Sequence, residues 1–149
     1  MINIAILSVV LLAALAVGVL LRRREGRVRA ANVNADGMSD STRAELLADV
    51  GVTGSGPAVL HFSAEWCGPC SAVRRVVANV TEQLARSPQP PLDIEVDVDA
   101  EPALARELNV LSLPTTFVFD SAGRERFRIS GVPKAMDLHS ALEPLTVAA

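Results

Sequence analysis

The fold of this 149-residue chain is indicated first by residues 62–70, Phe62-Ser63-Ala64-Glu65-Trp66-Cys67-Gly68-Pro69-Cys70. This stretch contains both cysteines of the sequence. The short, mostly apolar run 58–62 before it is typical of a strand covered on both faces. Apolar residues at helical spacing follow it and predict a helix over about 67–86 (Val73, Val76, Val77, Val80 and Leu84). The cysteine pair is therefore expected where a buried strand leads into a helix.

Two cysteines at the start of a helix can form a small disulfide and reopen it. The partial positive charge and free N–H groups of a helix N-terminus favour the thiolate form of Cys67, which is the expected attacking sulfur. Cys70, one turn further along, is expected to be more buried and to resolve the mixed disulfide. Gly68 and Pro69 between them hold the turn tight.

Two other interpretations of the cysteine pair are half of a zinc site and a pair of inert thiols. Zinc needs about four ligands, and only His61 and His139 remain as further nitrogen ligands. We therefore expect no metal, and no cofactor apart from a redox-active Cys67–Cys70 disulfide. His139 is interpreted as a surface or edge residue of the last helix.

The rest of the chain alternates helices and strands. Strands separated by helices imply parallel pairing, and a final hairpin adds antiparallel strands. The predicted fold class is α/β, with a central mixed sheet of four to five strands flanked by helices. The other expected elements are helices over 42–50, 102–108 and from 133 onward, and strands over 92–98, 116–119 and 125–129, with a possible short strand at 28–30.

These features together resemble the thioredoxin family over roughly residues 40–146. Besides the cysteine motif, the resemblance rests on Leu113-Pro114-Thr115, which directly precedes the third strand. In thioredoxins the proline at that place is cis and packs beside the redox pair. The resemblance implies that Trp66, Leu113 and Pro114 help to dock an extended segment of the substrate, and that Gly68 and Pro69 support the site.

The sequence departs from the family pattern at three positions. Where thioredoxins usually carry a buried aspartate, this chain has His61, and where they carry a lysine on the next strand it has Glu95. Our hypothesis is that His61 accepts the proton of Cys70 while Glu95 orients it, because histidine suits proton transfer near neutral pH. The alternative is a core histidine without a kinetic role. Ser63 replaces a frequent tryptophan, so the partner surface differs.

The N-terminal segment is predicted to anchor the chain in a lipid bilayer. Residues 2–21 carry no charge, and a helix of that length spans about 30 Å, the thickness of a bilayer core. A cleaved signal peptide would begin with basic residues, and a buried helix would show a polar face. The expected organisation is a transmembrane helix or signal anchor over 1–21, a basic collar and linker over 22–38, and a thioredoxin-like domain over 39–149.

Charge is distributed unevenly around this anchor. Residues 22–29 hold five arginines against Glu25, whereas the whole chain has a net charge of −3. Positive flanks stay cytoplasmic, so we predict a single-pass protein of the inner or cytoplasmic membrane with its catalytic domain on the cytoplasmic side. The collar also suits anionic lipid headgroups. The acidic remainder argues against binding to nucleic acid.

The function predicted from these features is a membrane-tethered thiol–disulfide oxidoreductase that reduces protein disulfides. Its expected partners are disulfide-containing proteins and an electron donor such as a thioredoxin reductase or another dithiol. One alternative is an extracytoplasmic thioredoxin-like protein for cytochrome maturation or thiol exchange. Another is a binding module that keeps the fold and has only incidental redox activity.

Overall fold

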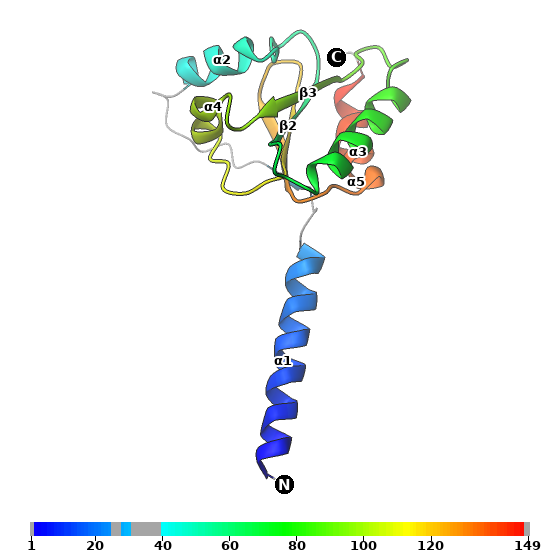
Figure 1. Ribbon diagram of the computed structural model, residues 1–149. Coiled ribbons are helices and arrows are strands. Elements are labelled where there is room, and N and C mark those ends of the chain that lie inside the picture. Colours follow the sequence, from blue (N-terminus) through cyan, green and yellow to red (C-terminus); the bar gives the residue numbers. More distant parts are fainter. Residues whose placement is uncertain (1, 25–27, 31–39, 148–149) are drawn as a thin grey trace.

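The computed structural model describes residues 2–24, 28–30 and 40–147 (Figure 1). The predicted linker therefore lies largely outside the described residues. The elements are α1 (Ile2–Arg24), β1 (Arg29–Ala30), α2 (Asp40–Asp49), β2 (Ala58–Ser63), α3 (Cys70–Gln83), β3 (Leu92–Asp97), α4 (Pro102–Glu107), β4 (Thr115–Phe119), β5 (Glu125–Ser130), α5 (Ala135–Leu142) and a 3₁₀ turn η1 (Glu143–Leu145).

The strands form one mixed sheet in the order β1-β5-β4-β2-β3. β2 pairs in parallel with β3 and antiparallel with β4, while β4 and β5 form the hairpin. The expected α/β sheet of four to five strands is confirmed. The possible short strand near residue 29 is confirmed as β1, which pairs antiparallel with β5.

Helices cover both faces of the sheet and create two apolar cores. Alternate residues of β2 point to opposite faces because the side-chain period of a strand is two. Leu60 and Phe62 pack with Leu104 of α4 on one face. Val59 packs with Val77 of α3 and Leu138 of α5 on the other. β2 is thus buried along its whole length, as its apolar sequence predicted.

Helix α3 begins later than the sequence pattern predicted. It starts at Cys70 and ends at Gln83, with Pro69 as its N-terminal cap, whereas a start at Cys67 was expected. Periodicity identifies a helix much better than it identifies the terminal residue. Cys67 therefore lies in the loop before the helix, and Cys70 is the first helical residue.

Helix α1 contains 23 residues, and its described side chains, at Ile6, Leu7 and 9–19, are exposed. No helix within the described part of the chain is both long and apolar enough to cross a membrane. The predicted transmembrane helix is therefore not confirmed.

Candidate active site

The two cysteines close a disulfide at the end of β2. The Cα atoms of Cys67 and Cys70 are 5.5 Å apart. The loop between β2 and α3 is held by backbone hydrogen bonds from Cys67 N to the carbonyl of Ala64 (3.1 Å) and from Cys70 N to the carbonyl of Cys67 (3.3 Å). This loop brings both sulfurs to the N-terminus of α3, as the sequence predicted.

The two sulfurs differ in exposure. Cys70 is 3% exposed, and its Sγ lies 3.9 Å from the carbonyl oxygen of Phe62. Cys67 is half-buried, and Gly68 and Pro69 beside it are exposed. A large substrate can therefore reach Cys67 and not Cys70, which is the difference in burial that the sequence predicted.

The loop before β4 lies at the same end of the sheet as the disulfide. The Leu113–Pro114 peptide bond is cis, as the family resemblance implied. Thr115, the next residue, pairs with Phe62 of β2. The carbonyl of Pro114 accepts a hydrogen bond from Gly131 N (2.9 Å), and Leu113 is half-buried. Three loops therefore lie at this end of the sheet with the cysteines: 64–69, 111–114 and 131–134. We call these three loops together the redox edge.

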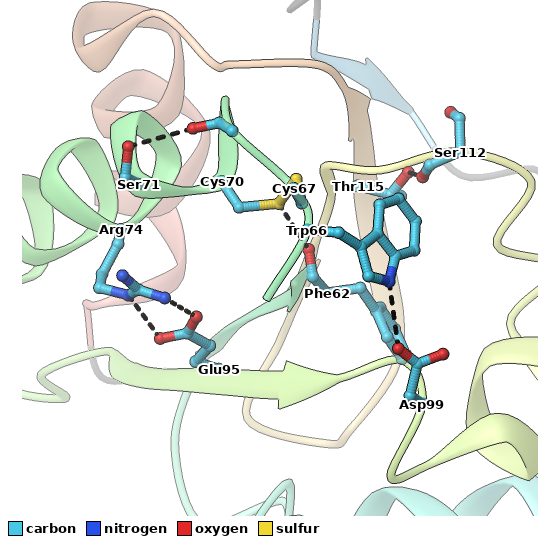
Figure 2. Close-up of a disulfide and its surroundings, with 11 residues drawn as sticks. Phe62, Trp66, Cys67, Cys70, Ser71, Arg74, Glu95, Asp99, Ser112 and Thr115 are labelled. Atoms are coloured by element: carbon cyan, nitrogen blue, oxygen red, sulfur yellow. Dashed lines mark hydrogen bonds and ion pairs between the residues drawn. A yellow bond between two sulfur atoms is a disulfide. The ribbon is translucent and has the colours of Figure 1, made fainter. Parts of the chain in front are cut away.

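Trp66 projects from the redox edge with 71% of its surface exposed. Its Nε1 donates a hydrogen bond to Asp99 Oδ2 (3.2 Å), as Figure 2 shows. The carboxylate of Asp97 accepts a hydrogen bond from the backbone N–H of Asp99 (2.8 Å) and fixes this turn. Asp99 was missed as a site residue in the sequence, where it looked like one more acid of an alternating strand.

His61 is buried, but its partner differs from the one expected. His61 Nε2 lies 3.0 Å from Asp93 Oδ1. Glu95 is beside His61 in the strand register, yet its two oxygens accept hydrogen bonds from Arg74 (2.7 and 2.5 Å; Figure 2). The expectation that Glu95 orients His61 is therefore wrong. A guanidinium binds both oxygens of a carboxylate at once, so Arg74 of α3 competes better than an imidazole.

Thr116 adds a polar group that the sequence did not reveal. It lies opposite His61 in the antiparallel pairing of β2 and β4, so the two side chains share one face of the sheet. Its Oγ1 is buried and has no hydrogen-bond partner among the described residues. Buried hydroxyls are rarely left unpaired, which marks this spot beneath α3 as unusual.

Among the acids at the site, Glu95 has the most strongly shifted pKa. The hydrogen bonds from Arg74 lower its pKa to about 2; burial opposes this shift, and Ser63, the charge of Arg74 and the nearby His61 add to it. The folded-state pKa is depressed, so the Arg74–Glu95 pair stabilises the fold above the normal pKa of 4.5. That stabilisation is lost as the pH falls through the folded pKa.

The Glu95→Gln variant is expected to lower the free energy of unfolding modestly at neutral pH. Its difference from the parent should shrink as the pH falls from about 4.5 toward 2, because the parent carboxylate is then protonated as well. Urea unfolding at several pH values measures this difference. Glu82→Gln, at an exposed position of α3, is the matched control and should show no such trend. A difference that is constant with pH would contradict the prediction.

The two histidines are the remaining candidates for metal ligands. Among the described residues, no group of three or more His, Cys, Asp or Glu side chains is arranged to hold a metal ion. His139 is in the last turn of α5, and its Nδ1 lies 4.0 Å from Oε2 of Glu143 in η1.

The disulfide lies between a strand and the N-terminus of a helix, and a cis-proline lies beside it on a mixed sheet. These features together define a class of dithiol proteins. The family model described as thioredoxin matches residues 39–144. The chain belongs to the thioredoxin family.

Several characterised proteins are similar to this chain. The bifunctional thioredoxin reductase/thioredoxin of Mycobacterium leprae is 37% identical over 99 residues, which cover 66% of this chain and 20% of that protein. The thioredoxin of Mycolicibacterium smegmatis is 44% identical over 68 residues, 44% of this chain and 57% of that protein. The matches thus span less than two thirds of either relative. A solved mutant thioredoxin from Halobacterium salinarum has a TM-score of 0.58 and 28% identity, covering 69% of this chain and 85% of that one.

Proposed function

We propose that this chain is a membrane-tethered thiol–disulfide oxidoreductase that reduces protein disulfides. The observation that carries the redox activity is the Cys67–Cys70 disulfide at the redox edge, with one sulfur accessible and the other buried. Family membership supports the same chemistry. Such exchange needs no metal and no bound cofactor.

The proposed cycle begins from the dithiol. The Cys67 thiolate attacks one sulfur of a substrate disulfide, a mixed disulfide forms, and the other substrate sulfur leaves as a thiolate. Cys70 then loses its proton and attacks Cys67 Sγ, which releases the second substrate thiolate and closes the Cys67–Cys70 disulfide. Two electrons pass from the protein to the substrate. A donor dithiol, of the thioredoxin reductase type or another kind, returns them.

Substrate docking is assigned to the redox edge. Trp66 offers an exposed aromatic surface beside Cys67, and Leu113 is half-buried next to the cis-proline. The backbone of Leu113 and the ring of Pro114 are proposed to align an extended substrate segment with Cys67. Gly68 leaves room for this approach, because a Cβ added at this position would meet no atom within 4 Å.

His61 is proposed to accept the proton of Cys70, with Asp93 in the orienting role first given to Glu95. His61 lies on the face of β2 that packs against α3, because it alternates with Val59 of that core. Cys70 opens α3 and points to the same side, among its buried residues. The carboxylate of Asp93, about one third exposed, hydrogen-bonds the His61 ring and holds its orientation.

Membrane tethering and cytoplasmic location are the finer parts of the proposal. They are supported by the uncharged run 2–21, the exposed apolar side chains described in α1, and the arginines of the collar 22–29. The name of the Mycobacterium leprae relative joins a reductase to a thioredoxin, which supports a reductase-type electron donor.

Membrane vesicles of opposite orientation test activity, tether and location together. We expect inside-out vesicles from cells that produce the full chain to reduce added insulin with dithiothreitol as donor. Right-side-out vesicles should stay at the background rate, because insulin does not cross the bilayer. Activity found only in the soluble fraction would contradict the membrane tether. Activity found only in right-side-out vesicles would contradict the cytoplasmic location. The absence of activity from every fraction would contradict the reductase function.

A further inference from the structure

The strand directions determine where the chain enters the domain. β1 runs antiparallel to β5, with Arg29 opposite Arg128 and Ala30 opposite Phe127. β5 ends at Ser130, which pairs with Thr115. The start of β1 therefore lies toward the end of the sheet where β5 leads into loop 131–134. This is the redox edge, so the chain arrives from α1 on the side of the cysteines.

The connection between α1 and the domain is short. Val28 packs against the core beneath α3 and α5, and α1 ends at Arg24. Four Cα–Cα steps separate these two residues, a reach of at most about 14 Å. Figure 1 shows α1 leaving the domain on the side where α3 and α5 begin. A membrane that binds α1 would therefore lie close to the redox edge.

Exposed apolar side chains gather at the same edge. Trp66, Leu111 and Val132 lie on its three loops, and Met136 lies in the first turn of α5. Among the described residues of the domain, the other large apolar side chains that are exposed are Leu92 and Val147, at the opposite end. The start of β3 and the end of the last helix define that opposite end.

From these observations we infer that the redox edge faces the membrane surface, and that the substrates are disulfides in membrane proteins close to the bilayer. This inference rests on the proposed membrane tether. A short connection that enters at the redox edge turns this edge toward the bilayer. Trp66, with an apolar ring and a hydrogen-bonding nitrogen, suits the interface between lipid and water. A disulfide far above the membrane would have to reach around the domain.

Two membrane-anchored substrates test the inference. Both carry the same disulfide hairpin on one transmembrane peptide, either directly after the span or after a flexible Gly/Ser spacer of about 60 residues. With the full chain reconstituted in the same vesicles, we expect the near disulfide to be reduced about tenfold faster than the far one, because its effective concentration at Cys67 is higher. Inserting about 30 flexible residues after Arg24 should bring the two rates together.

Surface variants provide a matched pair. Leu111→Ser at the redox edge is expected to slow reduction of the near disulfide, whereas Leu92→Ser at the opposite end leaves it unchanged. Equal effects of the two variants would overturn the inference.

The outcomes separate the inference from the function on which it rests. A chain that does not float with vesicles lacks the tether, and one that fails to reduce soluble insulin lacks the reductase activity. If the chain floats and reduces insulin but reduces near and far disulfides at equal rates, the proposed function stands and the orientation of the redox edge is wrong.

Discussion

Cys67→Ser is expected to abolish insulin reduction by the full chain. Cys67 is the half-buried sulfur of the pair, so it is the one that a bulky disulfide can reach. The thiolate is the nucleophile of disulfide exchange, and a serine hydroxyl is not ionised near neutral pH. We expect the rate above the dithiothreitol background to fall by at least about a thousandfold, as when other enzymes lose their nucleophile.

Cys70→Ser separates the two steps of the cycle. The first attack remains possible, but the mixed disulfide can no longer be resolved from within the protein. Mass spectrometry should therefore find the chain joined covalently to a substrate. Ser71→Ala is the matched control, because its hydroxyl only bonds the carbonyl of Gly68 (3.2 Å). Full activity in Cys67→Ser, or no adduct in Cys70→Ser, would contradict the assigned order of attack.

The strands around the site could be predicted from their apolar residues, which form a nearly continuous run in β2 and alternate with acids in β3. β2 is mostly apolar, with His61 and Ser63 as its polar residues, and it is buried on both faces, as expected. β3 alternates apolar and acidic residues, and its alternation correctly indicated a strand. Its burial is less regular, since Leu92 is exposed and only Val96 is fully buried. The reason is that β3 is the last strand of the sheet and has a neighbour on one side only.

The partner of His61 could not be predicted from strand register alone. Register places Glu95 beside His61, and the structure confirms that pairing of the backbones. Which carboxylate binds the imidazole depends on α3, whose Arg74 takes Glu95 and leaves Asp93. Such competition between side chains of distant segments has no signature in the sequence of either strand.

Two further features of the site, the cis-proline bond and the buried hydroxyl of Thr116, differ in how far they could be predicted. The cis bond before Pro114 was anticipated through the family resemblance, since cis and trans X–Pro bonds differ by only about 0.5–1 kcal/mol and local sequence does not decide between them. The hydroxyl of Thr116, which has no hydrogen-bond partner among the described residues, was not anticipated. A threonine inside an apolar strand is ordinary, and a single sequence does not show what its hydroxyl contacts.

His61→Gln is expected to slow the resolving step by about a hundredfold, at the low end of what general bases contribute. The glutamine can still hydrogen-bond Asp93, so the buried site is not emptied. The pH dependence of the resolving rate should differ between the parent and the variant, because the amide of glutamine cannot accept a proton as an imidazole does. Decay of a preformed Cys67 mixed disulfide, followed by quench-flow mass spectrometry at several pH values, measures the step.

The neighbouring carboxylates form a matched pair that tests the structure against the register. Asp93→Asn removes the carboxylate that hydrogen-bonds the His61 ring and orients it, so its resolving rate should fall. Glu95→Gln should lower this rate less, because that carboxylate hydrogen-bonds Arg74 and not His61. The opposite ranking of the two variants would restore Glu95 as the partner of His61. A parental pH profile in His61→Gln would show instead that the histidine only fills the core.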